Sequence, residues 1–456
     1  MGEMSSFKDQ RFTLIKLFPW TLYALFAGAF LCFYLYPLPF SQPFVNQLSP
    51  NNPNLEPLNL SPSHLQSSPS SSPPSASQEV ETTQTPEDEQ EDKNHQCDYT
   101  EGKWVKDNLG PPYNDTSCGT IKDGRNCISH GRPDSGYLYW KWEPNQCELP
   151  KFEPHMFLQL LSNKHLAFVG DSLARNQLES LLCLLSAISS PRLVYNYGED
   201  DRFRRWHFDS HNFTLSNYWS PLLVKGIEKS EKGNHFNTLY LDYVDEKWAS
   251  DLDQMDMVVL DAGQWFLLSA VYYEGGLALG CHLCPGLNHT EIGFYDAYGK
   301  VLRTSLKSII ERRGHNGDGK PISVLVTTFP PAHFEGEWDK FGSCSKTKPY
   351  EDGEKSMGSM DEQMRKIGIE EVEFARENAK QFGNVRLETL DVTKLAFMRP
   401  DGHPGPYMLP FPFAQGPRDR VPNDCVHWCL PGPIDTWNEI LLEMTKRWEA
   451  QSTTQR

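Results

Sequence analysis

The sequence lacks an excess of basic residues. Its 456 residues include 43 Lys and Arg against 60 Asp and Glu, which gives a formal net charge of −17. Because such a chain has little to offer a phosphate backbone, nucleic-acid binding is disfavoured. The chain also lacks the composition of a disordered protein, since 12% of its residues are aromatic and need a core. Long apolar runs are absent apart from one, which excludes a protein with several membrane spans.

The one long apolar run is Leu17–Tyr36, which carries no charge. Its length matches a helix that crosses the hydrocarbon core of a bilayer. Basic residues precede it and none follows before Lys93, so the positive-inside rule places residues 1–16 in the cytosol and the rest in a lumen. A cleaved signal peptide is the alternative, although its apolar region is usually only about 7–15 residues long. We therefore predict a type II signal anchor at residues 17–36.

The segment after the anchor, residues 37–96, is rich in Ser and Pro and ends in an acidic cluster. Such a composition buries too little apolar surface to offset the entropy of the chain, which predicts a disordered stalk. Beyond it, residues 97–150 are rich in Cys, Gly, Pro and Trp and predict an irregular lobe. Residues 151–456 then form the expected catalytic domain.

Ten cysteines follow the anchor, and an even number in an oxidising lumen predicts disulfides without giving their connectivity. Only Cys281 and Cys284 have a spacing typical of zinc sites, so no metal is predicted. Sequons on the lumenal side predict glycosylation at Asn114, Asn212 and Asn288.

The expected catalytic domain shows compact apolar runs that alternate with segments of helical spacing. The runs predict strands at residues 164–169, 255–260, 322–327 and 385–390. The helical segments lie at residues 174–188, 296–312, 361–381 and 435–448. This alternation predicts an α/β fold in which helices cover both faces of a parallel sheet.

The first chemical motif, Gly170-Asp171-Ser172, lies at the turn between the first predicted strand and helix. Ser172 would therefore stand at the carboxyl edge of the sheet, where α/β proteins bind their ligands. The N-terminus of the helix would favour an oxyanion beside the Ser172 hydroxyl. Asp and Ser are also ordinary helix caps, so this motif alone leaves a purely structural role open.

The second motif, Asp424-Cys425-Val426-His427-Trp428-Cys429, places an acid three residues before a histidine. A serine nucleophile needs a histidine base, and the base needs a partner that fixes its tautomer. A surface Asp and His beside a structural cystine is the alternative for this segment taken alone. Together, the two motifs favour serine acyl transfer with Ser172, Asp424 and His427 as the catalytic residues.

These motifs resemble those of the plant trichome-birefringence-like family of polysaccharide O-acetyltransferases, which have an SGNH/GDSL-esterase-like fold. The resemblance also rests on Cys97–Trp104, on Gly131-Arg132-Pro133-Asp134 and on Trp140-Lys141-Trp142, and it covers nearly all of residues 97–450. Within the family, His130–Trp142 and Ala174–Ser186 resemble the xyloglucan O-acetyltransferases.

The resemblance implies that Ser172 takes up an acetyl group in the Golgi lumen, with Asp424 and His427 completing its triad. It implies a polysaccharide acceptor, with xyloglucan side-chain galactose expected, and an acetyl donor but no bound cofactor. Whether a membrane partner supplies the donor is left open. The alternatives are transfer to mannan or another wall polysaccharide, an acetyl esterase with the same triad, and a non-catalytic protein that binds or bridges wall polymers.

SGNH enzymes complete an oxyanion hole with a Gly and an Asn from later blocks, and no clear Asn follows the nearest glycine here. The candidate oxyanion donors are Gly263, Arg175 and Asn176. The candidates for stacking against sugar rings are Trp140, Trp142, Trp265 and Tyr272, with a place in the core as the alternative for each.

Overall fold

The computed structural model describes residues 97–454, apart from 199–201, 231–232, 234 and 315–319. The predicted cytosolic tail, signal anchor and stalk lie outside the described residues. Among the helices that the structure does describe, none is both long and apolar enough to cross a membrane.

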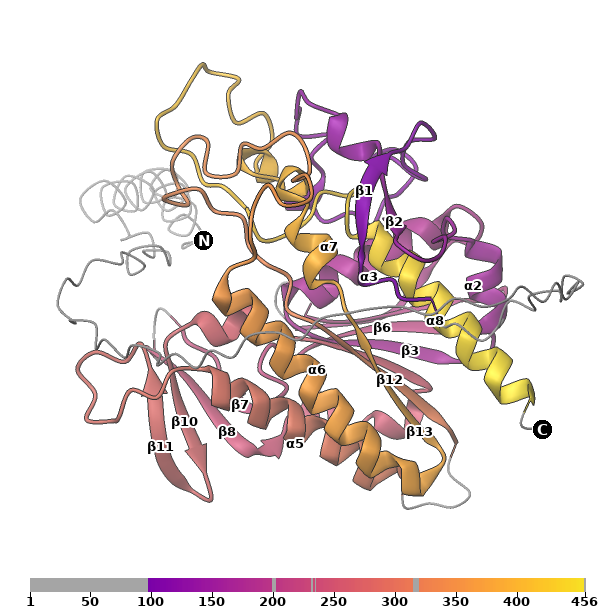
Figure 1. The fold of residues 1–456 in the computed structure, drawn as a ribbon, viewed down its shortest axis with the longest axis vertical. Helices are drawn as coiled ribbons and strands as arrows, with labels where there is room; N and C mark the ends of the chain where they lie inside the picture. The colour runs from indigo at the N-terminus through magenta and orange to yellow at the C-terminus, as the bar shows by residue number, and fades with distance from the viewer. Residues whose placement is uncertain (1–96, 199–201, 231–232, 234, 315–319, 455–456) are drawn as a thin grey trace, which may run out of the picture. The chain divides into compact units, whose positions relative to one another are not determined.

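A seven-stranded sheet lies at the centre of the described chain (Figure 1). From edge to edge, its strands are β13 (Val385–Leu390), β12 (Ile322–Thr327), β9 (Met257–Asp261), β3 (His165–Gly170), β6 (Phe213–Trp219), β5 (Phe203–Phe208) and β4 (Arg192–Tyr197). The four strands predicted from apolar runs appear as β3, β9, β12 and β13, so the α/β prediction is confirmed.

The expectation of a wholly parallel sheet was incomplete. The strands from β13 to β6 pair in parallel, but β5 pairs antiparallel with both β6 and β4. Only residues 209–212 join β5 to β6. So short a connection cannot carry the chain back across the sheet, which a parallel pair requires.

Helices cover both faces of the central sheet, as predicted. On β3, Leu166 and Phe168 pack with α2, α3 and α8, whereas Ala167 and Val169 face the core under α5 and α6. Successive side chains of a strand point to opposite faces, so a strand buried on both sides reads as an unbroken apolar run. The helices are α2 (Pro154–Leu160), α3 (Ser172–Ser186), α4 (Glu246–Ala249), α5 (Tyr295–Gly314), α6 (Ser359–Ala379), α7 (Thr393–Phe397) and α8 (Asp435–Thr454).

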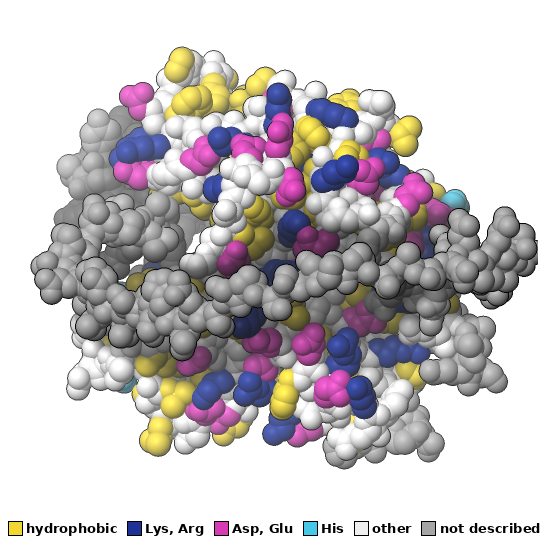
Figure 2. Space-filling view, in the orientation of Figure 1, with side chains coloured by type: hydrophobic (Ala, Val, Ile, Leu, Met, Phe, Trp, Pro, Cys, Tyr) yellow, Lys and Arg dark blue, Asp and Glu magenta, His cyan; other side chains and the backbone are white. Residues whose placement is uncertain are grey.

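A second, four-stranded sheet was not predicted. Its order is β11 (Leu277–His282), β10 (Ala270–Glu274), β8 (Asn237–Val244) and β7 (Val224–Ile227). Strands β7, β8 and β11 mix buried with exposed residues, so they lack the continuous apolar signal of β3 or β12. Over the face of the molecule in Figure 2, basic side chains are interleaved with acidic ones.

Residues 97–150 contain a short antiparallel pair, β1 (Gly102–Lys106) and β2 (Trp140–Pro144), within mostly irregular chain. The prediction that the ten cysteines form disulfides is confirmed. The pairs are Cys97–Cys147, Cys118–Cys183, Cys127–Cys429, Cys281–Cys284 and Cys344–Cys425. The second and third join this Cys-rich segment to the rest of the chain.

Candidate active site

The turn that presents Ser172 depends on the absence of a side chain at Gly170. A Cβ atom there would lie 1.7 Å from the carbonyl oxygen of Asp261, the paired residue on β9. Only glycine fits so close to a neighbouring backbone. The chain can therefore turn directly from β3 into α3, and Ser172 becomes the first residue of that helix, at the carboxyl edge of the sheet.

Asp171 caps helix α3 and also holds the neighbouring loop. One carboxylate oxygen accepts from the Leu173 N–H at 2.9 Å and the other from the Gly263 N–H at 3.3 Å. The side chain is buried, and burial raises its pKa. Burial beside Asp171 likewise raises the pKa of Asp261 well above its ordinary value. The helix cap thus also fixes the loop that follows β9.

The structure brings the three residues singled out by the motifs into one chain of hydrogen bonds. The Ser172 Oγ lies 2.6 Å from His427 Nε2, and His427 Nδ1 lies 2.7 Å from Asp424 Oδ2. Because a carboxylate only accepts, the hydrogen of the imidazole belongs on Nδ1, which leaves Nε2 to accept from the serine hydroxyl. The side chains of His427 and Asp424 are 21% and 15% exposed, so solvent can enter this edge of the sheet.

Asp424 is held as an anion. Burial alone would raise its pKa, but the His427 imidazole and backbone N–H donors outweigh burial and hold the pKa well below the ordinary value. The donors are the N–H groups of Val426 at 3.1 Å and of His427 at 2.9 Å. A charged Asp424 is suited to stabilising an imidazolium when His427 takes up a proton.

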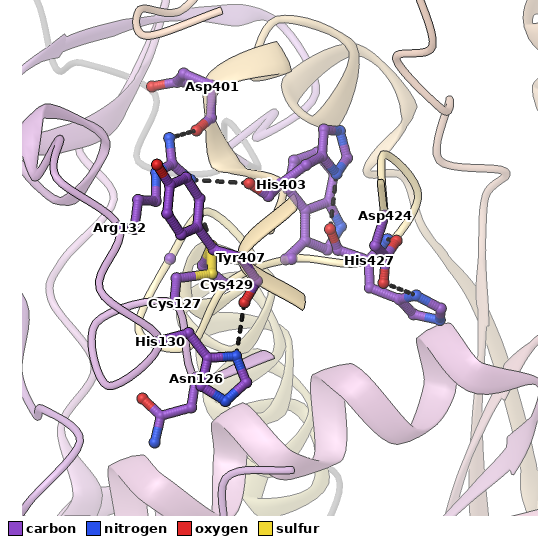
Figure 3. Close-up of a disulfide and its surroundings, with 12 residues drawn as sticks. Asn126, Cys127, His130, Arg132, Asp401, His403, Tyr407, Asp424, His427 and Cys429 are labelled. Carbon is purple, nitrogen blue, oxygen red and sulfur yellow. Dashed lines mark hydrogen bonds and ion pairs between the residues drawn. A yellow bond between two sulfur atoms is a disulfide. The ribbon is translucent and has the colours of Figure 1, made fainter. Parts of the chain in front are cut away.

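The loop that carries His427 is fastened from several sides (Figure 3). The Cys127–Cys429 and Cys344–Cys425 disulfides flank the histidine. The guanidinium of Arg132 donates to the carbonyl oxygens of Asp401 at 2.7 Å and His403 at 2.8 Å. Arg132 belongs to a segment that carries the family resemblance, but the sequence gives no indication of this contact with residues 401–403.

Arg125 is a second residue that the motifs did not indicate. It is 4% exposed, and its guanidinium donates to the Ser172 carbonyl oxygen at 3.3 Å and pairs with Glu179 at 3.0 Å. The Cys-rich segment therefore contacts the backbone of the serine itself. A lone arginine before a cysteine carries no recognisable sequence signal.

In the structure, two of the three candidate oxyanion donors make hydrogen bonds to other groups. The Asn176 amide is buried and bonds to both backbone groups of Trp428, and the Gly263 N–H is directed at Asp171. Arg175 lies one helical turn from Ser172, with its guanidinium 5.5 Å from the Trp219 ring. Backbone N–H groups in the first turn of a helix lack helical acceptors, and although Asp171 accepts from that of Leu173, the others at the start of α3 are a further source of donors.

Two of the four candidate stacking residues are not available to a sugar in this structure. Trp142 is 2% exposed, with its ring 5.6 Å from that of Trp104, and Tyr272 is fully buried. Trp140 lines a cavity of about 260 Å³ that none of Ser172, Asp424 and His427 lines. Trp142 and Tyr272 belong to the hydrophobic core, where large aromatic side chains are often found.

The fourth candidate, Trp265, packs against Trp219 at the end of β6. Its ring meets Trp219 edge to face at 5.6 Å, and Trp219 ends β6 opposite Gly170. Trp265 is partly exposed. No sequence motif indicates Trp219, whose ring contacts Trp265 and lies 5.5 Å from the Arg175 guanidinium.

The remaining site predictions concern modification and metal. Asn114, Asn212 and Asn288 are all exposed, and their glycosylation stays a prediction. Cys281 and Cys284 lie with Glu291 in a group that could hold a metal ion, but their sulfurs are joined in a disulfide, whereas metals bind thiolates.

Two family models match this chain over the part that contains the site and the segment before it. Residues 149–444, which include Ser172, Asp424 and His427, match the PC-Esterase model, described as a GDSL/SGNH-like acyl-esterase family found in Pmr5 and Cas1p. The chain belongs to the PC-Esterase family. The segment before it, residues 95–148, matches the PMR5 N-terminal domain. The family resemblance seen in the motifs is thereby confirmed.

Individual relatives are similar to this chain over most of their length. "Xyloglucan O-acetyltransferase 1" of Populus trichocarpa is 57% identical over 454 residues, covering 98% of this chain and 99% of the relative. "Xyloglucan O-acetyltransferase 1" of Arabidopsis thaliana is 58% identical over 354 residues, covering 77% and 81%. "Protein trichome birefringence-like 26" of the same plant is 43% identical over 356 residues, covering 76% and 77%.

Proposed function

We propose that this chain is an O-acetyltransferase that acetylates a hemicellulose, with xyloglucan as the acceptor, through an acetyl-Ser172 intermediate. The observation that carries the proposal is the hydrogen-bonded series Ser172–His427–Asp424, with contacts of 2.6 and 2.7 Å. Similarity to two xyloglucan O-acetyltransferases over most of their length supports the acceptor. The side-chain galactose as the acetylated sugar follows from the family resemblance.

The first half-reaction loads the serine. His427 Nε2 takes the hydroxyl proton as Ser172 Oγ bonds to the acetyl carbon, and the donor's leaving group departs with the proton that His427 returns. Asp424 stabilises the imidazolium formed between these events. The oxyanion of the tetrahedral intermediate lies beside the N-terminus of α3, whose dipole favours negative charge.

The second half-reaction unloads the serine onto a sugar. His427 takes the proton of a sugar hydroxyl while the sugar oxygen bonds to the acetyl carbon, and Ser172 Oγ departs and regains a proton from His427. Transfer wins over hydrolysis only if the sugar is held close and oriented. Trp265, which is partly exposed and packs edge to face on Trp219, is the remaining aromatic candidate for holding the sugar.

The proposed location is the Golgi membrane, with the catalytic part in the lumen and a single type II anchor at residues 17–36. Five disulfides support an oxidising compartment. The anchor rests on the sequence. The acetyl donor is an activated acetyl compound that a separate membrane partner could supply.

Product analysis tests the function directly. The full chain is incubated with an activated acetyl ester and, side by side, with xyloglucan and glucomannan oligosaccharides, and the products are analysed by mass spectrometry. Acetylated xyloglucan oligosaccharide is the expected product. Free acetate without an acetylated sugar identifies an esterase, and acetylated glucomannan alone identifies a mannan acetyltransferase. Activity that survives Ser172→Ala would overturn the serine mechanism.

A further inference from the structure

Two buried histidines that neither motif contains lie behind the loop of His427. His403 is 2% exposed and His333 is 5% exposed. His403 Nδ1 lies 2.7 Å from the His427 carbonyl oxygen (Figure 3), and His403 Nε2 lies 2.7 Å from His333 Nδ1. The series ends where His333 Nε2 meets the Phe397 carbonyl oxygen at 2.8 Å.

The series needs more protons than two neutral rings possess. A carbonyl oxygen only accepts, so the ring nitrogens that face His427 and Phe397 must each carry hydrogen. The contact between the two rings needs a hydrogen as well, because two bare nitrogens at 2.7 Å would repel each other. Three contacts therefore require three N–H groups, whereas two neutral imidazoles supply two.

We propose that His333 and His403 share one additional proton, and that this imidazole–imidazolium pair positions His427 by holding its backbone carbonyl. The two histidines are positioning residues, because they reach the reacting atoms only through His427. Their effect on catalysis rests on the proposed function. Their proton count does not depend on it, because it follows from the contacts alone.

Some surroundings of the pair favour a positive charge on it, and others disfavour one. His403 stacks on Trp428 at 4.2 Å between centroids, and a cation is favoured over an aromatic face. The Asp424 carboxylate also favours a positive charge. Against this, burial lowers the pKa of His333 to about 4 and that of His403 well below its ordinary value. The three short contacts oppose this lowering of the pKa, because the neutral pair leaves one of the contacts without a hydrogen.

Other charged and titratable groups face the pair from the elements packed around it. They are Lys355, which disfavours a charge on His333, His427, which disfavours one on His403, Arg132, which donates to the His403 carbonyl oxygen, the buried Arg399–Asp401 ion pair, and Tyr350, whose ring lies 6.1 Å from that of His333.

The direction of the pH response follows from the sign of the charge. As pH rises through the apparent pKa of the pair, the additional proton is lost, and with it one hydrogen bond of the series. Loss of that hydrogen bond predicts a decline in rate on the alkaline side that belongs to the pair.

Imidazole nitrogen spectroscopy tests the proton count without any use of activity. The full chain is labelled with ¹⁵N-histidine, and the two rings are assigned by difference from His333→Gln and His403→Gln. We expect three protonated nitrogens on the two rings near pH 6 and two at a higher pH. Two protonated nitrogens at every pH between about 5 and 8, where histidine titrates, would overturn the proposal.

Kinetics test the positioning role, with a buried histidine elsewhere as the control. His333→Gln and His403→Gln should each lower kcat about tenfold with little change in KM, and should remove the alkaline decline. His165 is also buried, bonds to Gln254 and Ser216, and begins β3 at the edge opposite Ser172. His165→Gln should therefore keep the rate and pH profile of the wild type.

The two ways of failing are distinguishable. If both variants match the wild type in kcat and pH profile, the positioning role is wrong. If Ser172→Ala retains acetyl transfer while three protonated nitrogens are seen, the proposed function fails and the shared proton stands.

Discussion

Asn176 and Trp428 exchange two hydrogen bonds. The Trp428 N–H donates to Asn176 Oδ1 at 2.8 Å, and Asn176 Nδ2 donates to the Trp428 carbonyl oxygen at 3.3 Å. This buried pair joins helix α3, which begins with Ser172, to the loop that carries His427. The two ends of the catalytic series are thus held in register by an amide that takes no part in the chemistry.

Removing this amide should slow catalysis more than it alters substrate binding. We expect Asn176→Ala to lower kcat about ten- to hundredfold, because a small displacement between nucleophile and base has a large effect on rate. Asn438→Ala is the matched control, since Asn438 is equally buried and bonds to Gln177 and Ser180 farther along α3. Steady-state kinetics that showed the same loss of kcat in both variants would contradict this role.

The state of Asp424 should decide the tautomer of His427. In Asp424→Asn the amide can donate, so it no longer fixes the hydrogen on His427 Nδ1, and we expect kcat to fall about 10³–10⁴-fold with the fold intact. Circular dichroism and the thermal midpoint verify the fold. A fall in kcat of less than tenfold would remove Asp424 from the mechanism.

The disulfides should separate into those that serve the site and those that serve stability. We expect the double variant Cys127→Ser/Cys429→Ser to lose about 2–5 kcal/mol of stability and most of its kcat, because this bond anchors the loop beside His427. The double variant Cys97→Ser/Cys147→Ser should lose stability and keep kcat, since its bond lies within the Cys-rich segment. Equal loss of kcat in both would show that the bonds act only through the fold.

A buried acid on α8 should make stability depend on pH. Burial raises the pKa of Glu439 from 4.5 to about 7. The folded state therefore holds this proton more tightly than the unfolded state, and stability falls as pH rises from 4.5 to 7. Glu439→Gln should be more stable than the wild type at pH 7.5, by about 3 kcal/mol, and equal to it at pH 4. Chemical denaturation at both values measures this.

The control for this prediction is Glu362→Gln, because Glu362 is exposed on α6. It should change stability little at either pH. A Glu439→Gln protein with no gain at pH 7.5 would show that the acid is already charged at no cost in the folded state.

Burial determined which strands could be predicted from the sequence. The strands β3, β9 and β12 were predicted because burial on both faces leaves a continuous apolar run, and the edge strand β13 was predicted although Arg386 and Glu388 interrupt its apolar residues. β4 was missed because all of its residues are exposed, so their side chains carry no such pattern. A local sequence pattern therefore reveals a strand only when burial leaves apolar residues along it.

The same limit applies to the site. Ser172, Asp424 and His427 could be proposed because each lies in a compact motif with a recognisable chemical order. The supports of the site, such as Arg125, Asn176 and His403, act across the fold, and their partners lie far away in the sequence. Trp142 shows the opposite error, because an aromatic side chain suited to sugars proved to be part of the core.

The central claim is that Ser172 carries the acetyl group, and trapping the intermediate tests it most directly. The full chain is mixed with an isotopically labelled acetyl ester without acceptor, quenched in acid, digested and analysed by mass spectrometry. We predict one labelled acetyl group on Ser172, which disappears when xyloglucan oligosaccharide is added and reappears on the sugar, and which is absent from Ser172→Ala. Label on another residue, or label transferred to the sugar by Ser172→Ala, would contradict the account.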